Sequence, residues 1–359
     1  MQFPDRKKRL SFLVSLLLVL GSCQKTGLEI EEGPTPYILE IPSLFVEKLI
    51  PPFIPVDNSL TVEGVALGEK LFFDKQLSRD GILSCGSCHL PEHSFGDRRA
   101  LSLGFRRQEG TRNAMPLFNL AWNFEDQFNW DGKARGLESQ ALEPVTNPLE
   151  MNNTWANVIQ TLQRNPQYPP LFEASFGTSD IDSLLVTKAL AQFQRTLVSG
   201  DSPFDAFLEG ERSLSPEQAN GFAVFMDEDK GDCFHCHGSE NNPLWTDNTF
   251  HNNGLDSVFI DLGLGAISGD PADNGKFKTP SLRNLSRTAP YMHDGRFETL
   301  EQVVDHYSEG LKPSATVDPL MKKVNQGGVH LSTKEKADLI AFLRALTQED
   351  FGRGLGPRD

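Results

Sequence analysis

Apolar residues recur every three or four positions in four stretches of the chain, and each stretch predicts a helix. The first covers residues 62–73. The second covers residues 183–198, and Gly200 is expected to stop it. The third and fourth follow Ser215 and Ser332 and run to about residues 226 and 346. Each serine has Gln or Glu three positions later, which is the pairing of a helix capping box.

The four helices fall into two halves of similar plan, with the first and last helix of each half expected to cross. Residues 200–203, Gly-Asp-Ser-Pro, mark the link between the halves. No long stretch alternates apolar and polar residues, which argues against an extended sheet. The sequence therefore predicts a mainly α fold with two domains, residues 58–202 and 203–350, and a tail at residues 351–359.

Residues 1–22 have the pattern of an export signal. Four basic residues, Arg6 to Arg9, precede an apolar run over residues 10–20, and small residues lead to Cys23. The run is shorter than the roughly 20 residues of a membrane-spanning helix. We expect a lipoprotein in which Cys23 is acylated and residues 23–57, rich in Pro, Gly and Glu, tether a periplasmic body to the membrane. The alternative is an ordinary cleaved signal with an incidental cysteine.

The formal net charge of the chain is −15. Loss of residues 1–22, which hold four basic residues and one acidic residue, leaves about −18. This balance argues against nucleic acid as a partner, because phosphate contacts require a basic surface. It favours a basic redox protein as a partner, although the sum does not locate the acidic surface.

Four of the five cysteines form two Cys-x-x-Cys-His strings. Two thiols at this spacing can add to the vinyl groups of one haem, and the adjacent histidine can bind its iron. We expect one cytochrome c-like domain around each of two covalent haems. A zinc site or a redox disulfide is the alternative, and a second copy of the string behind an export signal argues against it. The expected attachment residues are Cys85, Cys88, Cys233 and Cys236, and the expected proximal ligands are His89 and His237.

The sixth iron ligand decides what each haem does, because an open position can bind peroxide. Near the first string His93 is too close in the chain to reach the opposite haem face, and no other histidine occurs before His235. The first haem is therefore the candidate open site. For the second haem the residue types leave several ligands open, namely Met292, His293, His306, Tyr307, Met321 and His330.

Over about residues 60–348 the chain resembles the bacterial dihaem cytochrome c peroxidases and their relative MauG, which matures a tryptophan-derived quinone cofactor. Beside the two haem strings, the motifs that carry the resemblance are Gly110-Thr111-Arg112-Asn113, Trp130-Asp131-Gly132-Lys133-Ala134, Pro148-Leu149-Glu150-Met151, Thr279-Pro280-Ser281-Leu282-Arg283-Asn284 and Ala289-Pro290-Tyr291-Met292-His293-Asp294-Gly295-Arg296.

The resemblance implies that peroxide reacts at the first haem. It assigns Glu150 to the distal carboxylate that moves protons as the O–O bond breaks, and Pro144 to the same pocket wall. It assigns Trp130 to an electron relay between the haems. It also implies a calcium ion between the domains, bound through oxygen atoms of Asn113, Thr288 and Pro290. Taken alone, these residues also suit a helix-terminal charge, a core tryptophan and turn or loop positions.

Two positions depart from the conventional peroxidases. Phe105 stands where they carry a distal histidine, so the first haem is expected to be five-coordinate without reductive activation. Tyr307 stands where they carry the methionine ligand of the second haem, as it does in MauG. A tyrosinate would stabilise ferric iron relative to methionine. His306 is the main rival ligand.

The expected function is peroxide reduction at the first haem, with electrons passed through the second from a small cytochrome or cupredoxin. The alternatives are a MauG-like oxidase of a partner protein or other substrate, a non-catalytic dihaem electron carrier, and a haem-based sensor. Homodimers are common in the family, but no dimer surface can be read from the sequence. A basic loop could pair haem propionates, receive an acidic partner or simply be solvated; it contains Arg98, Arg99, Arg106, Arg107 and Arg112.

Overall fold

Short helices joined by long loops make up most of the chain in the computed structural model, which describes residues 33–356. The predicted signal segment and Cys23 lie outside the described residues. Among residues 33–356 no helix has both the length and the apolar character that a membrane span requires. The α-helices are α1 Ser43–Lys48, α2 Val62–Phe72, α3 Leu137–Gln140, α4 Glu143–Thr146, α5 Trp155–Arg164, α6 Tyr168–Phe176, α7 Ser183–Arg195, α8 Pro203–Leu208, α9 Pro216–Met226, α10 Phe234–His237, α11 Gly265–Ser268, α12 Leu300–Glu309 and α13 Thr333–Ala345.

The described strands are short and form two antiparallel pairs. β1 Gln127–Phe128 pairs with β2 Ala134–Arg135. β3 Phe250–His251 pairs with β4 Phe277–Lys278, with Phe250 opposite Lys278. The prediction of a mainly α-helical chain with long loops is confirmed.

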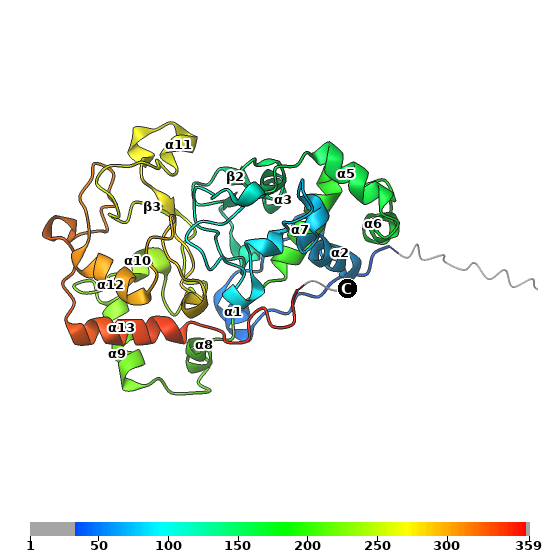
Figure 1. Cartoon of the computed structure of the whole chain (residues 1–359). Coiled ribbons are helices and arrows are strands. Elements are labelled where there is room, and N and C mark those ends of the chain that lie inside the picture. The colour runs from blue at the N-terminus through cyan, green and yellow to red at the C-terminus, as the bar shows by residue number, and fades with distance from the viewer. Residues whose placement is uncertain (1–32, 357–359) are drawn as a thin grey trace, which may run out of the picture. The chain divides into compact units, whose positions relative to one another are not determined.

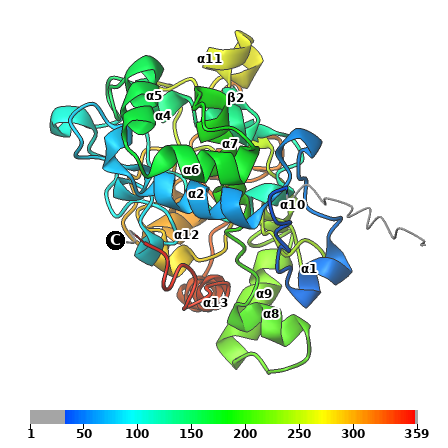
Figure 2. The same cartoon turned by 90° about the vertical axis from the view of Figure 1, so that its right-hand side faces the viewer.

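In the first half the two predicted helices are α2 and α7, which pack against each other, and α6 covers α2 (Figure 2). Side-chain caps from Thr61 and Asp182 open α2 and α7. The expected stop at Gly200 is wrong, because α7 ends at Arg195 and Thr196 is its C-cap. Gly200 instead allows close packing, since a methyl group there would lie 2.5 Å from Cγ of Pro42.

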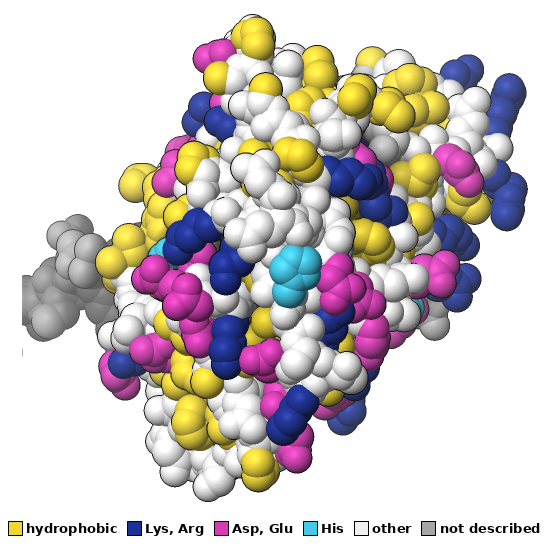
Figure 3. All heavy atoms as spheres, turned by 90° about the vertical axis from the view of Figure 1, so that its left-hand side faces the viewer, with side chains coloured by type: hydrophobic (Ala, Val, Ile, Leu, Met, Phe, Trp, Pro, Cys, Tyr) yellow, Lys and Arg dark blue, Asp and Glu magenta, His cyan; other side chains and the backbone are white. Residues whose placement is uncertain are grey.

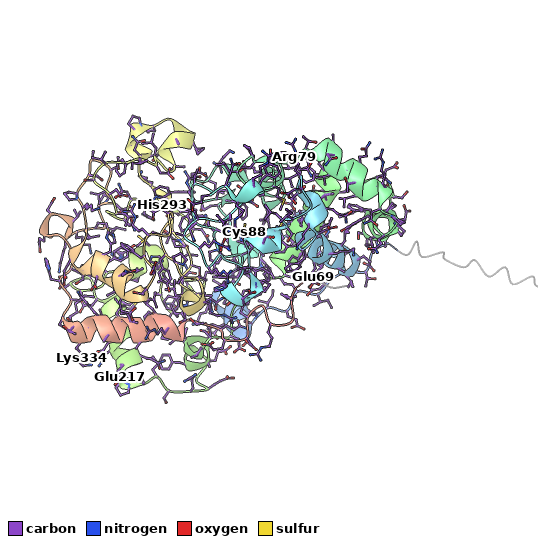
Figure 4. The ribbon with its side chains drawn as sticks, in the orientation of Figure 1. Glu69, Arg79, Cys88, Glu217, His293 and Lys334 are labelled. Carbon is purple, nitrogen blue, oxygen red and sulfur yellow. The ribbon has the colours of Figure 1, made fainter. Side chains whose placement is uncertain are left out.

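In the second half the predicted helices are α9 and α13, and both capping boxes are present. Ser215 pairs with Gln218, and Ser332 pairs with Glu335. The two helices contact each other, and Figures 1 and 4 show their N-terminal ends together, labelled by Glu217 and Lys334 in Figure 4.

Each helix crossing depends on a glycine. A methyl group on Gly68 of α2 would lie 2.0 Å from the carbonyl oxygen of Ala189 in α7. A methyl group on Gly221 of α9 would lie 1.9 Å from the carbonyl oxygen of Asp338 in α13. Both distances are far below van der Waals contact, so the two halves repeat the same close backbone approach.

The hydrophobic core has two main clusters of buried side chains. One draws mainly on residues 67–197 and the other on residues 204–346. Phe351, at the start of the predicted tail, is buried in the first cluster against Phe95 and Phe118. Part of the predicted tether also packs on the body, since Phe45 of α1 is buried against Trp122. The division into two haem-binding domains stays a prediction.

Candidate active site

A cavity of about 430 Å³ lies beside the first Cys-x-x-Cys-His string. Its lining brings together residues far apart in the sequence, including Cys85, Cys88, His89, Trp130, Pro144 and Glu150. Figure 4 shows Cys88 among the elements of the first half. Lining residues 278–281 come from the second half of the chain, so both halves build the cavity.

The local fold orients His89 for metal binding. Cys85–Ser87 form a single 3-10 turn, and Nδ1–H of His89 donates a hydrogen bond of 2.8 Å to the carbonyl of Phe95. This bond fixes the tautomer and leaves Nε2 as the ligand atom. Burial lowers the pKa of His89, which favours the neutral imidazole that a metal needs. The string therefore fits a haem whose iron is bound by His89.

Glu150 is an exposed residue that lines the cavity. The protein atoms around its carboxyl group reduce its solvation, which raises its pKa, opposed by a hydrogen bond of 2.6 Å that Asn147 donates to Oε1. Glu150 lies in a turn after α4, so its expected alternative role as a helix N-terminal charge does not apply. Pro144 of α4 lines the same cavity. The carboxyl group can exchange protons with a ligand held in the cavity.

Phe105 lies next to Glu150 through the backbone. Its N–H donates a 2.6 Å hydrogen bond to the carbonyl of Glu150, while its ring faces the guanidinium groups of Arg79 and Arg106. The preceding Gly104 lines the cavity, and a methyl group there would lie 1.7 Å from the carbonyl oxygen of Leu149. The loop that carries Phe105 therefore packs directly on the turn that carries Glu150.

Trp130 lines the cavity and is buried. Its indole N–H donates a 2.8 Å hydrogen bond to the carbonyl of Asn113, and its own carbonyl accepts one from the backbone N–H of Lys278. Trp130 thus connects the first half to strand β4 of the second half.

The second string holds a half-buried histidine, and one of its ring nitrogens is unpaired within residues 33–356. Nδ1 of His237 has no hydrogen-bond partner among the described residues, and burial lowers the pKa of His237 to about 4. Burial also raises the pKa of Cys233 to about 12, so both groups are uncharged. A neutral histidine beside two half-buried thiols fits the attachment of a second haem.

Tyr307 faces this second string. Its hydroxyl accepts a 3.0 Å hydrogen bond from Nδ2 of Asn253. Burial raises the pKa of Tyr307 to about 12, and the nearby Cys233 and Cys236 contribute to the rise. The side chains that act on neighbouring His306 are instead Lys312, Arg296 and Asp256, and its ring packs against Phe297. Tyr307 is therefore the one of the two that lies by the cysteines of the second string.

The remaining candidate ligands have other surroundings. Met292 lies by the same amide as Tyr307, with its sulfur 3.6 Å from Nδ2 of Asn253. The ring of His293, labelled in Figure 4, stacks on Phe277 at 3.6 Å. His330 is exposed and bonds the carbonyl of Gln326. The backbone N–H of Met321 donates a 2.9 Å hydrogen bond to the carbonyl of Asp318.

The residues expected to bind calcium lie near the junction of the two halves. The backbone N–H of Asn113 donates to the carbonyl of His293, and its side-chain amide donates to the carbonyls of Arg99 and Ala100. The peptide bond between Ala289 and Pro290 is cis, and Thr288 follows a 3-10 turn. The calcium site stays a prediction.

Three polar residues near the two strings escaped the sequence analysis: Asn253, His251 and Lys278. Both ring nitrogens of His251 bond carboxylates, Asp247 at 2.8 Å and Asp318 at 2.6 Å, and Asp247, Cys236 and Asp318 together raise its pKa to about 11. The ligand atoms of His251, Asp247 and Cys236 lie within 4.8 Å of one another, so the charged imidazole sits beside the second string. These residues lie outside both strings in the sequence, and nothing in the residues beside them indicates that the fold brings them close to a string.

The comparisons with known proteins agree on one family. The family model described as di-haem cytochrome c peroxidase matches residues 62–213. The methylamine utilization protein MauG of Methylophilus methylotrophus is 40% identical over 81% of this chain and 84% of its own. The cytochrome-c peroxidase IdrP2 of Denitromonas iodatirespirans is 36% identical over 82% of this chain and 84% of its own. A solved MauG-like protein associated with microbial copper homeostasis is 34% identical, with a TM-score of 0.79 over 89% of this chain and 97% of that one.

Proposed function

The chain belongs to the di-haem cytochrome c peroxidase and MauG family, and on that premise we propose that it is an oxidoreductase that uses peroxide at its N-terminal haem. The family implies two c-type haems. The observation that carries the proposal is the cavity, which brings Glu150 and Trp130 to the side of the string that holds His89.

A haem bound at the first string would supply an iron that can take peroxide in its open position. Cys85 and Cys88 hold it, and His89 Nε2 is its ligand because Nδ1 is engaged by Phe95. Glu150 accepts a proton from the incoming peroxide and returns it to the leaving oxygen. Its raised pKa brings proton uptake and release closer to neutral pH than for a solvated glutamate.

Trp130 is the residue that passes electrons between the two halves. Its indole N–H is bonded to a carbonyl, so its geometry is fixed, and its backbone is joined to β4. Electrons enter through the second half. Its haem would be attached at Cys233 and Cys236, with His237 and Tyr307 as the iron ligands. The donor would be a small cytochrome or cupredoxin.

A second function is favoured by one observation. Asn253 donates a hydrogen bond to the Tyr307 hydroxyl and so orients this tyrosine beside the second string. Because an anionic oxygen ligand stabilises oxidised iron, the protein would then oxidise residues of a partner protein or another substrate, as MauG does.

Whichever of the two functions holds, we also propose a calcium ion bound by Asn113, Thr288 and Pro290, a lipid anchor at Cys23 on the periplasmic side, and a homodimer.

The test is electron paramagnetic resonance of the ferric protein before and after one equivalent of peroxide, with haem content at each string measured by peptide mass spectrometry. We expect two attached haems, one high-spin and one low-spin signal, and loss of both signals on adding peroxide. Two low-spin signals that ignore peroxide would contradict the enzyme and leave an electron carrier.

A further inference from the structure

Lys278 is a lysine of the second half that is buried at the cavity of the first half. It is the last residue of β4, only 6% of its surface is exposed, and it lines the cavity with Trp130 and His89. Its backbone N–H donates a 2.9 Å hydrogen bond to the carbonyl of Trp130. The position of the side chain is therefore tied to the tryptophan.

The partners of the Lys278 ammonium group are all uncharged. Nζ donates to the carbonyl of Asn248 at 2.6 Å and to Oδ1 of Asn123 at 3.5 Å, and it lies 5.3 Å from the centre of the Phe250 ring. Asp247 and Glu125 act on it only over longer distances, and desolvation outweighs them, so the pKa falls to about 8. Within residues 33–356 no carboxylate forms an ion pair with it.

The other two cationic side chains that line the cavity already have carboxylate partners. Arg112 bonds Asp131 at 2.6 Å and Asp261 at 2.7 Å. Lys133 lies 3.1 Å from Glu143. Lys278 is the one of the three without a carboxylate partner among the described residues. A buried charge without a counter-ion is costly, so an anion bound beside Lys278 would be stabilised.

We propose that the Lys278 ammonium group is the counter-ion of a propionate of the haem attached at Cys85 and Cys88. The inference rests on the proposed function, which places a haem in this cavity, and a haem brings carboxylates of its own. A side chain of the second half would thereby hold the haem of the first half, next to Trp130. Lys278 is a positioning residue in this role, distinct from the arginine loop that the sequence suggested for propionates.

The test compares Lys278→Met with Lys278→Arg and with Lys276→Met. Lys276 lies two residues away and pairs with Asp273 at 2.9 Å, so it is a matched control outside the cavity. Each variant is made with haem labelled with carbon-13 at the propionate carboxylates, for redox-difference infrared spectroscopy. Haem content at each string and the reduction potential of each haem are measured on the same samples.

In Lys278→Met we expect both haems to be attached, a shifted propionate band, and a roughly tenfold rise in the ferric to ferrous ratio of the first haem at fixed potential. That ratio corresponds to about 59 mV for a one-electron couple. Its direction follows because loss of a nearby positive charge favours ferric iron. Lys278→Arg should restore the ratio to near the wild-type value, and Lys276→Met should match wild type.

An unchanged propionate band and potential in Lys278→Met, with haem attached, would overturn the inference and leave the proposed function intact. Absence of haem from the Cys85 and Cys88 peptide of the wild-type protein would instead overturn the proposed function. If circular dichroism shows that Lys278→Met does not fold, Lys278→Gln carries the same comparison, since its amide can still donate to the Asn248 carbonyl.

Discussion

Glu150 is the residue whose protonation should control the reaction with peroxide. Desolvation raises its pKa, and the charge of Glu143 adds to the rise. Because a base must be deprotonated to accept a proton, the rate should increase as pH rises through a pKa above the ordinary value of about 4.3. Glu150→Gln should lower the second-order rate by roughly 10²- to 10⁴-fold and remove this pH dependence, as measured by stopped-flow absorbance.

The matched control for Glu150 is Glu143→Gln. Glu143 lines the same cavity but pairs with Lys133, so its variant should retain most of the rate. A wild-type rate in Glu150→Gln would remove this carboxylate from the mechanism.

Tyr307 and His306 are adjacent residues with different surroundings, which makes them a matched pair. Tyr307→Phe should alter the low-spin resonance and raise the potential of the second haem by at least about 59 mV, a tenfold change in the ferric to ferrous ratio. The reason is the loss of an anionic ligand. His306→Phe should leave both quantities near wild type. If only His306→Phe changes the low-spin signal, histidine is the ligand and the MauG-like function loses its support.

At the scale of helices, the glycines of the two crossings should govern stability. In an exposed helix Gly→Ala stabilises by about 1 kcal/mol. Gly68→Ala and Gly221→Ala should instead destabilise by about 1–3 kcal/mol, since the methyl group meets a backbone carbonyl of the partner helix. Thermal unfolding of the two variants measures this. Ala66→Ser, on the exposed face of α2, is the control and should change the unfolding midpoint little. A higher unfolding midpoint in Gly68→Ala or Gly221→Ala would show that the helices can move apart.

The helices were predictable because their signals are local. Ser215 and Ser332 cap their own helices, and the apolar period of α2 and α7 marks the faces that pack. Gly200 was misread because a glycine after a helix is normally a stop, whereas here it permits contact with Pro42, which is distant in the sequence.

The site was predictable only in part, for the same reason. Spacing pointed to the haem strings, motifs of the family pointed to Glu150 and Trp130, and the aligned position of the family's methionine ligand pointed to Tyr307. Lys278 and Asn253 gained their positions from contacts with Trp130 and Tyr307 across large sequence separations. No periodicity or short motif encodes such contacts.

At the scale of the whole body, the two halves are joined by specific polar contacts. The backbone N–H of Asn113 donates to the carbonyl of His293 at 2.8 Å, and Asn284 donates to the hydroxyl of Ser199 at 3.0 Å. Within the second half, Arg283 pairs with Asp205 through two 2.7 Å bonds with both side chains buried, so this arginine of a family motif has a structural role.

Figure 3 shows acidic and basic side chains intermingled on one face, so the net negative charge does not mark that face as a single acidic docking surface.

Arg112 provides a charged link between the halves, because it bonds Asp131 of the first and Asp261 of the second. Burial by itself would raise the pKa of Asp261, but the hydrogen bond from Arg112 lowers it overall. A depressed carboxyl pKa contributes stability that is present above the unfolded pKa of about 3.9 and is lost as pH falls through the folded pKa. Arg112→Met should therefore lose about 2 kcal/mol at pH 7 and a smaller amount near pH 3, as measured by thermal unfolding.

The same variant tests whether Arg112 joins the halves or only stabilises its own loop. Its loss should speed hydrogen exchange at the amides of Asn113 and Lys278, which donate across the junction. Arg296 pairs with Asp256 and Asp294 inside the second half, so Arg296→Met is the matched control and should leave those two amides protected. Equal hydrogen-exchange rates at these amides in the two variants would mean that apolar contacts and backbone hydrogen bonds hold the halves together. The hydrogen bond from the Lys278 N–H to the Trp130 carbonyl would then not depend on Arg112.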